Sequence, residues 1–365
     1  MIRELSSIHQ VSAEAWDALL PGGYPFLRHG FLSALEDSRA TSEQTGWVTK
    51  HLVYEIDGVL IAALPLFEKY HSRGEYVFDF AWADALERAG GQYYPKLLSA
   101  APFTPATGPR LLGDAQHASA FQSHLDELLT QYSSWHGLFP SADDGCNALS
   151  GDWRYGVQYH WHNADYIDFD AFLATMTSKR RKAIKRERRI VAEQGITLQR
   201  ISGRDTTPQQ RAYFYHFYQQ TYQVRGQVGY LNSDTFGMLF DRMGDQMVLV
   251  LAQHEDEPVG AALLFHDAHT LYGRYWGGQP IDCLHFEACY YQGIEFAIEQ
   301  NLQHFDPGAQ GEHKIPRGFE PTKTRSLHQI AHPEFRAAVK RYLAQEALAV
   351  DDWQQRAMQA LPFKV

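Results

Sequence analysis

Apolar and polar residues follow two different spacings along this 365-residue chain. In residues 50–67, two strand-like apolar runs flank Asp57 and Gly58, and a DG pair between such runs predicts a β-hairpin. Residues 246–265 repeat this pattern around an acidic turn. Apolar residues three and four positions apart predict helices at residues 26–37, 117–132, 211–222, 284–299 and 333–347. Because strands and helices mix without a strict β-α-β repeat, the pattern predicts an α+β fold.

A chain of this length is expected to form two domains. The two hairpin segments, EIDGVLIAALPLF and QHEDEPVGAALLF, lie in different halves of the chain. They indicate either an internal duplication or a chance resemblance between two common hairpins. We expect an N-terminal domain over residues 1–155 and a C-terminal domain over residues 156–365, which would include a basic linker helix at 178–193 and the candidate active site.

Shorter patterns lead to three local predictions. Residues 76–80, with the sequence YVFDF, are typical of a further strand. Asp170 is placed to cap a helix that begins at Ala171. Gly195 follows the basic segment and predicts the end of its helix.

Composition and charge narrow the classes of function. Hydrophobic residues make up 44% and charged residues 21%, as in ordinary globular proteins. A net charge of -10 means that a nucleic-acid partner can be argued only from a local basic patch. Three cysteines predict no disulfide framework and favour a reducing compartment. The N-terminus lacks the apolar core of a signal peptide, and no run approaches ~18 apolar residues, so we expect a cytoplasmic protein without a transmembrane segment.

Titratable and aromatic residues are concentrated in residues 271–319, which favours a ligand site there. Carboxylate and imidazole groups can act as bases there, and lysine and arginine side chains can hold an anionic group. The candidate catalytic residues are Glu287, His313 and His285. The candidate substrate- and anion-binding residues of this stretch are Arg274, Trp276, Tyr272, Gln310, Lys314 and Arg317. Each of these charged groups is also compatible with a structural role.

Residues 179–189 contain eight basic residues in eleven positions. They form either a solvated helix face or a surface that binds phosphates of RNA, a nucleotide donor or a lipid-linked precursor. The candidate phosphate ligands in this helix are Lys179, Arg180 and Arg186.

Several long segments resemble the FemAB-like group of N-acyltransferases, a branch of the GNAT superfamily. The segments are GEYVFDFAW, YYPKLLSAAPFTPATGPRLL, QYHWHNADYIDFDAFLATMTSKRRKAIKRERR, YGRYWGG, LHFEACYYQGIEFAI and PGAQGEHKIPRGFEPTKT. The resemblance implies two tandem GNAT-like domains with mostly antiparallel central sheets flanked by helices. It also implies transfer of an acyl or aminoacyl group to a small-molecule or peptide-like amine.

The resemblance leaves the donor open between acyl-CoA and aminoacyl-tRNA, with no tightly bound cofactor. The chain lacks both the Q/R-x-x-G-x-G/A pyrophosphate loop of CoA-dependent relatives and the coiled-coil insertion of tRNA-dependent ones. The alternative function is a non-catalytic binder of anionic polymer, RNA or lipid headgroup through residues 179–189. A thiol nucleophile at Cys289 and a zinc site at His160 and His162 are further alternatives, and small buried thiols are the commoner case. The oligomeric state is not predicted.

Overall fold

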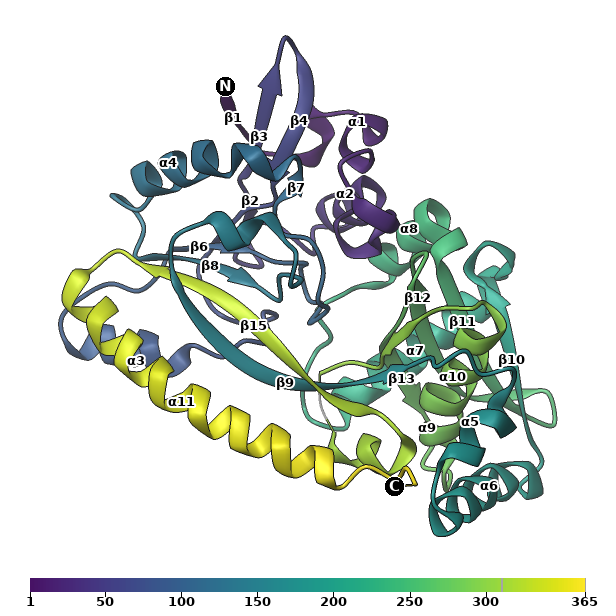
Figure 1. Cartoon of the computed structure of the whole chain (residues 1–365). Coiled ribbons are helices and arrows are strands. Elements are labelled where there is room, and N and C mark those ends of the chain that lie inside the picture. Colours follow the sequence, from purple (N-terminus) through teal and green to yellow (C-terminus); the bar gives the residue numbers. More distant parts are fainter. Residues whose placement is uncertain (310, 365) are drawn as a thin grey trace. The chain divides into compact units, whose positions relative to one another are not determined.

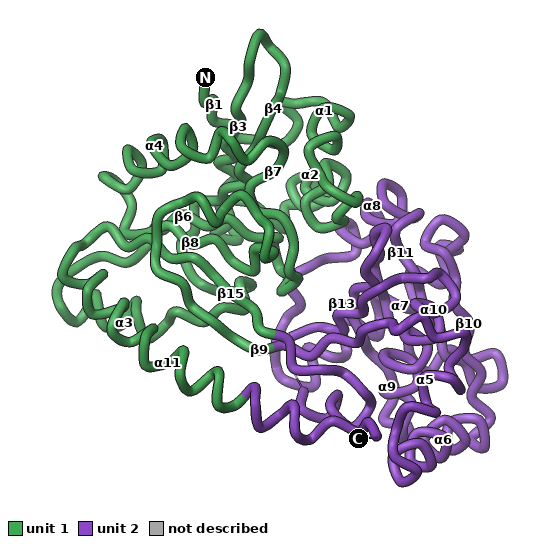
Figure 2. The backbone as a smooth tube through the Cα atoms, viewed as in Figure 1, with its two compact units in different colours: residues 1–157, 323–353 green, residues 158–322, 354–365 purple. Residues whose placement is uncertain are grey.

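The computed structural model describes residues 1–309 and 311–364, and Figure 1 shows the chain coloured along its sequence. Its contacts divide it into two compact units (Figure 2). Unit 1 consists of residues 1–157 and 323–353, and unit 2 of residues 158–322 and 354–365. The predicted C-terminal domain, residues 156–365, includes residues 323–353, and its boundary after residue 155 stays a prediction.

Unit 1 contains short helices and two groups of paired strands. Its helices are α1 (Ala13–Asp17), α2 (His29–Asp37), α3 (Phe80–Arg88) and α4 (Ala118–Leu128), with 3₁₀ turns at η1 (Ile8–Gln10), η2 (Pro21–Gly23), η3 (Pro25–Leu27), η4 (Ala115–His117) and η5 (Gly145–Ala148). Its strands are β1 (Ile2–Leu5), β2 (Trp47–Thr49), β3 (His51–Ile56), β4 (Val59–Leu64), β5 (Phe67–Lys69), β6 (Lys96–Ser99), β7 (Leu112–Gly113) and β8 (Ser134–Leu138).

Unit 2 contains longer helices and strands. Its helices are α5 (Phe169–Thr175), α6 (Ser178–Glu193), α7 (Pro208–Gln223), α8 (Ser233–Met243), α9 (Leu284–Phe286), the π-helix η8 (Glu287–Tyr291) and α10 (Gln292–Glu299), with 3₁₀ turns at η6 (Gly203–Asp205), η7 (Gly244–Gln246) and η9 (Glu312–Arg317). Its strands are β10 (Ile196–Ser202), β11 (Met247–His254), β12 (Glu257–His266), β13 (Thr270–Gly278) and β14 (His304–Asp306). The chain passes between the units within β9 (Asp152–His162), β15 (Glu320–Ile330) and α11 (Pro333–Gln359).

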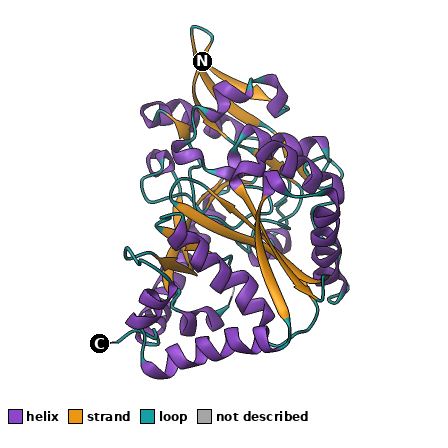
Figure 3. Ribbon diagram, turned by 90° about the vertical axis from the view of Figure 1, so that its right-hand side faces the viewer, coloured by secondary structure: helices purple, strands orange, loops and turns teal. Residues whose placement is uncertain are grey.

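The strand pairing is mostly antiparallel in both units. In unit 1, one sheet has the order β1-β3-β4-β7, and a second series runs β15-β8-β6-β5-β2 with β6 and β8 parallel. In unit 2, the order is β10-β11-β12-β13-β14-β9, with β13 and β14 parallel. Figure 3 shows the strands grouped in sheets with helices outside them. The predicted α+β fold with mostly antiparallel sheets is therefore confirmed.

Both predicted hairpins form, and they share one irregularity. In β3–β4 the register shifts between Tyr54 and Glu55, two residues before a turn in which Asp57 and Gly58 have positive φ. In β11–β12 the shift falls between Ala252 and Gln253, again two residues before a turn with two positive-φ residues. A bulge adds one residue and increases the local twist. The same bulge at the same distance from the same kind of turn favours duplication over chance.

Three local predictions need correction or extension. Residues 76–80 form no strand, because Asp79 turns inward to a buried ion pair and α3 begins at Phe80. Helix α5 is capped by Asp168, whose side chain accepts a hydrogen bond from the backbone of Ala171, and Asp170 lies inside the helix. The C-terminal helix extends from 333 to 359, beyond its predicted end at 347. In the described part of the chain, no helix has the combined length and apolar character that crossing a bilayer demands.

Candidate active site

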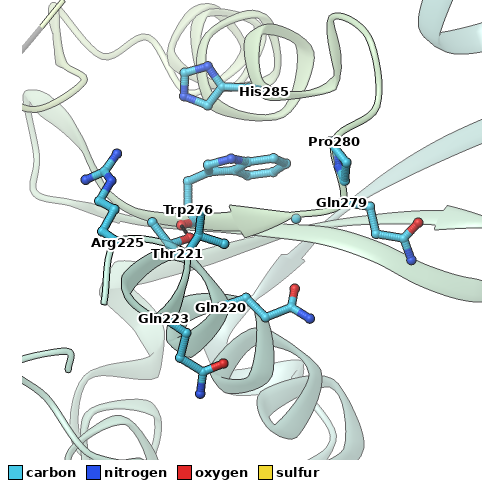
Figure 4. A pocket seen from close by; sticks show the side chains of 10 residues that line it. Gln220, Thr221, Gln223, Arg225, Trp276, Gln279, Pro280 and His285 are labelled. Carbon is cyan, nitrogen blue, oxygen red and sulfur yellow. Dashed lines mark hydrogen bonds between the residues drawn. The ribbon is translucent and has the colours of Figure 1, made fainter. Parts of the chain in front are cut away.

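A cavity of about 610 Å³ lies in unit 2 where helix α7, the end of strand β13 and the start of α9 meet. It is lined by Gln220, Thr221, Gln223, Val224, Arg225, Trp276, Gly278, Gln279, Pro280 and His285. Figure 4 shows the imidazole of His285 and the indole of Trp276 on one side, with the glutamines of α7 opposite. The cavity therefore combines one large aromatic surface with amide, imidazole and guanidinium groups, as ligand sites commonly do.

Close packing of α7 against β13 shapes this cavity. A Cβ atom on Gly277 would lie 1.9 Å from the carbonyl oxygen of Phe217, so only glycine allows the helix backbone to approach. The hydroxyl of Thr221 donates a hydrogen bond of 2.8 Å to the carbonyl of Trp276 and fixes the end of the helix on the strand. The sequence motif YGRYWGG thus positions Trp276 at the cavity wall.

His285 stands at the first turn of the helix that follows β13. Its ring is 5.7 Å from the Trp276 ring and 5.2 Å from the Tyr290 ring, both edge to face. Burial, followed by the nearby His313, Lys314 and Arg317, lowers the pKa of His285 to about 4. The imidazole is therefore uncharged at neutral pH and free to accept a proton.

His313 lies behind His285, with ring centroids 6.1 Å apart. Its Nε2 shares a hydrogen bond of 2.8 Å with the hydroxyl of Tyr290. Burial, followed by Lys314 and Arg317, lowers the pKa of His313 as well. Gly311 has φ of +115°, and a Cβ atom there would lie 2.2 Å from the His313 ring, so this glycine leaves room for the imidazole. The predicted pair His285 and His313 is thus brought together in an uncharged state.

Glu287 is buried in the π-helical turn η8, a type of irregularity that often occurs at functional sites. Arg188 of α6 donates two hydrogen bonds of 3.0 Å to its carboxylate, and Gln292 donates a third of 2.9 Å. Arg188 also pairs with Glu295 at 2.6 Å. Because its oxygens already accept charge-assisted bonds, Glu287 is a poor candidate for a free base.

The side chains of the predicted anion-binding residues Arg274, Lys314 and Arg317 are buried and bonded to protein groups. Arg274 pairs with Asp306 at 2.7 Å. Burial alone would raise the pKa of Asp306, but this guanidinium holds it at about 2. Lys314 donates to the carbonyl of Gly308 at 2.6 Å, and burial lowers its pKa to about 8.

Arg317 joins three groups of unit 2. It donates to Glu187 at 2.8 Å, to the Tyr291 hydroxyl at 3.0 Å and to the His313 carbonyl at 2.6 Å, and it stacks on Phe286 at 3.4 Å. These contacts use the guanidinium to fix the loop that carries His313. Arg317 therefore positions the His313 loop in this structure.

The other predicted site residues lie apart from this cluster. The hydroxyl of Tyr272 donates to Asp267 at 2.8 Å and lies outside the cavity lining. Gln310 lies outside the described residues. Lys179, Arg180 and Arg186 are exposed on α6 and line no part of the cavity.

Sequence reasoning missed Arg225 and the glutamines at positions 220, 223 and 279. The guanidinium of Arg225 has no hydrogen bond or ion pair to another side chain among the described residues, so it is available to an anionic group. Arg225 follows the aromatic helix predicted at residues 211–222, and this position was the only feature of the local sequence that could have indicated its role. Nothing in the sequence pattern brings residue 225 next to residue 285.

The alternative chemistries receive less support. Burial raises the pKa of the Cys289 thiol, which disfavours a thiolate nucleophile. His160 faces Asp306 at 3.8 Å, whereas His162 shares a hydrogen bond of 3.0 Å with His304. Over residues 1–309 and 311–364, no group of three or more His, Cys, Asp or Glu residues is placed to hold a metal ion.

Residues 7–365 match the FemAB-like family, described as peptidoglycan biosynthesis/recognition. The chain belongs to this family, as its sequence motifs predicted. The comparison with curated proteins found no match.

Two solved structures show a similar fold. FemX is 12% identical, with a TM-score of 0.54 over 90% of this chain and 98% of that chain. A conserved protein of unknown function from Bacteroides thetaiotaomicron VPI-5482 is 11% identical, with a TM-score of 0.52 over 90% of this chain and 99% of that chain. At such low identities these likenesses define the fold, and the activity must be argued from the site.

Proposed function

We propose that this protein is a transferase that moves an acyl or aminoacyl group onto an amine at the cavity of unit 2. Membership in the FemAB-like family supports the reaction class. The observation that carries the proposal is the cavity wall, where the uncharged imidazole of His285 faces the indole of Trp276 and the guanidinium of Arg225 lies on the same cavity. The reaction requires a base for the amine proton and donors for anionic groups, and His285 and Arg225 can supply these, while Trp276 adds an apolar surface for the substrate.

In this reaction the amine nitrogen attacks the carbonyl carbon of the donor, a C–N bond forms, and the bond to the donor's leaving group breaks. The attacking nitrogen becomes strongly acidic as the bond forms, so even the weakly basic imidazole of His285 can accept its proton. The leaving group of the donor needs a proton in return, and the same imidazole can return it. Tyr290 and His313, joined by their hydrogen bond, pack against the ring of His285 and hold its position.

Arg225 is the group that would hold an anionic part of the donor, because guanidinium binds phosphate and carboxylate by two parallel bonds. Acyl-CoA and aminoacyl-tRNA both carry phosphates, so either remains the proposed donor, as a substrate and without a tightly bound cofactor. The family description favours a peptide-like amine as acceptor. Glu287 is left out of the catalytic group because Arg188 already pairs with it.

A thermal-melting panel with acetyl-CoA, longer acyl-CoAs and aminoacyl-tRNA tests this proposal. A ligand at about 100 times its Kd adds about 2.7 kcal/mol to the stability of the folded state, which raises the melting temperature. We expect one donor class to raise it, and Arg225→Ala and Trp276→Ala to remove that increase. With the donor found, His285→Ala should lower turnover about 10²- to 10⁴-fold. No shift with any donor, or full turnover in His285→Ala, would contradict the proposal.

A second function is favoured by the cations of α6. Lys179, Arg180, Arg181, Lys182 and Arg186 have no ion-pair partner among the described residues, whereas Lys185, Arg188 and Arg189 are paired. Three of the unpaired cations lie in the first turn, where the helix dipole disfavours positive charge by about 0.3–1 kcal/mol each. Binding of an anionic polymer would offset this cost.

The triple variant Lys179→Ala, Arg180→Ala, Arg186→Ala separates the two functions in the same panel. The transferase proposal expects it to keep the donor-induced shift. If the variant loses binding, and wild-type affinity falls steeply between 50 and 200 mM salt in the way that phosphate contacts require, the binding function takes precedence.

A further inference from the structure

Unit 1 contains two buried lysines side by side on adjacent strands. Lys69 ends β5 and Lys96 begins β6, and the antiparallel register places them directly opposite each other. Both side chains are 0% exposed. Like charges directly opposite in a sheet are destabilising, and burial adds the loss of hydration. Such a pair calls for compensating anions close by.

One loop, residues 70–79, supplies these anions. Lys96 Nζ donates to Glu75 Oε2 at 2.7 Å, to Asp79 Oδ2 at 2.5 Å and to the Ser72 hydroxyl at 2.8 Å. These three bonds use all the donors of the ammonium group. Although burial alone would lower the pKa of Lys96, Glu75 and Asp79 raise it, so Lys96 is charged.

The loop satisfies Lys69 much less well. Its ammonium makes one long hydrogen bond of 3.4 Å, to the carbonyl of Arg73, and lies 3.8 Å from the centre of the Trp47 ring. Glu75 Oε1 is 3.9 Å away. This atom and Asp79 Oδ1 are buried without a hydrogen-bond donor among the described residues. Burial accordingly lowers the pKa of Lys69 to about 7 and raises that of Glu75 to about 7.

The loop buries its charged side chains and exposes aromatic ones, the opposite of the arrangement that solvation favours. Glu75 and Asp79 are 4% and 3% exposed, whereas the apolar rings of Phe78 and Phe80 beside them are 60% and 45% exposed. Burying charge while exposing aromatic surface is unfavourable on both counts. The two lysines hold the carboxylates inward, and the contacts that Lys69 receives in return are incomplete.

The residues beneath the loop add polar groups, and the guanidinium of Arg154 donates to the carbonyl of Phe78 at 2.8 Å. The Tyr93 hydroxyl donates to Asp79 Oδ2 at 2.7 Å and is 3.2 Å from His136 Nε2. His136 shares a hydrogen bond of 2.6 Å with His328. Burial lowers the pKa of both histidines, to about 3 for His136, so neither adds a positive charge.

We propose that Lys69, Lys96 and Tyr93 form an anion-binding site in unit 1, which the loop at residues 70–79 closes by placing Glu75 and Asp79 where the anionic oxygens of a ligand would bind. Two adjacent ammonium groups and a phenol donor fit a phosphate or diphosphate group, whose oxygens can contact both lysines at once. The ligand displaces the carboxylates, and the loop then turns its charges to solvent. This site is separate from the cavity in unit 2 and is independent of the transfer reaction.

Limited trypsin digestion of the wild-type protein tests the site, because Arg73 lies in the exposed part of the loop. Cleavage after Arg73 follows the population of the open loop when opening is fast. Pyrophosphate at about ten times its Kd for the open form should raise that population, and the cleavage rate, about tenfold. Cleavage after Arg39, an exposed turn residue of unit 1 outside this loop, should not change. Sodium chloride at equal ionic strength should change neither rate.

An unchanged or slower cleavage after Arg73 in pyrophosphate would overturn the proposal. A second measurement uses Glu75→Gln, which removes one competing charge. Pyrophosphate should raise the melting temperature of this variant more than that of the wild type, and Lys69→Met in the same background should remove the difference. Glu55→Gln, at an exposed ion pair with Arg3, is the matched control. Equal shifts in Glu75→Gln, Glu55→Gln and wild type would show a purely structural ion cluster. Since digestion uses the wild-type chain, the test also decides if Glu75→Gln does not fold.

Discussion

The hairpins β3–β4 and β11–β12 have the same bulge and the same kind of turn, but each unit contains one polar cluster of a different kind. In unit 1, the buried lysines Lys69 and Lys96 lie against the carboxylates of Glu75 and Asp79. Unit 2 places uncharged imidazoles next to a cavity of about 610 Å³. A shared backbone therefore supports two different solutions, a closed ionic cluster and an open neutral site.

The difference follows from the surroundings of each group. In unit 2, burial and the cations Lys314 and Arg317 act in the same direction on His285 and His313, so both rings lose their charge. In unit 1, burial and the opposite charges act against each other at Lys96, and the ion pairs prevail. The comparison teaches that burial selects a neutral group unless a counter-ion is carried into the interior with it.

The largest expected effect on stability comes from a substitution that breaks the ionic cluster of unit 1. Lys96→Met leaves Glu75 and Asp79 buried without their main partner, and removing one member of a buried pair costs about 3–5 kcal/mol. Lys50→Met, which removes a partly exposed pair with Glu4, should cost at most about 1 kcal/mol. Urea unfolding of both variants at neutral pH measures the difference. Similar small losses in the two would mean that the cluster contributes no more than a surface pair.

The next effect concerns the neutral site of unit 2 and its dependence on pH. The folded pKa of His285 is about 4, below its unfolded value of about 6.5. Its contribution is therefore complete above pH 6.5 and is lost as the pH falls through 4, up to about 3 kcal/mol. His285→Gln should lose correspondingly less stability than wild type between pH 7 and 4, as measured by urea unfolding at several pH values. Parallel curves for the two proteins would show that the pKa of His285 is the same in the folded and the unfolded state.

The smallest effect tests the packing that shapes the cavity. Gly277→Ala places a methyl group against the backbone of α7 at Phe217, and such overpacking costs about 1–3 kcal/mol. Gly237→Ala is the matched control, because a Cβ atom there meets nothing within 4 Å inside α8, so it should be neutral or stabilising. Thermal unfolding compares them. A Gly277→Ala protein as stable as the control would mean that α7 and β13 can separate freely.

Much of the fold could be predicted because local sequence patterns determine where its hairpins and helices form. The turn residues fixed both hairpins, the 3.6-residue period located helices such as α4 and α7, and the motifs identified the family. Where local pattern and tertiary contact conflict, the prediction was wrong. Residues 76–80 have the alternating pattern of a strand, but they form an irregular loop in which Asp79 makes a buried ion pair with Lys96.

The candidate site was predicted only in part, for the same reason. The sequence by itself determined which chemical groups lie in residues 271–319 and that α6 is basic. Only the tertiary structure decided that Arg188 pairs with Glu287, that His285 and His313 meet, and that Arg225 reaches their cavity. Hydrophobic periodicity predicts local secondary structure, because it depends on residues close together in the sequence. The ion-pair partner of a charged side chain depends instead on which distant segments pack together in the fold. The same holds for Lys69 and Lys96, whose burial no pattern of single residues reveals, because it depends on strand register and on the loop that closes over them.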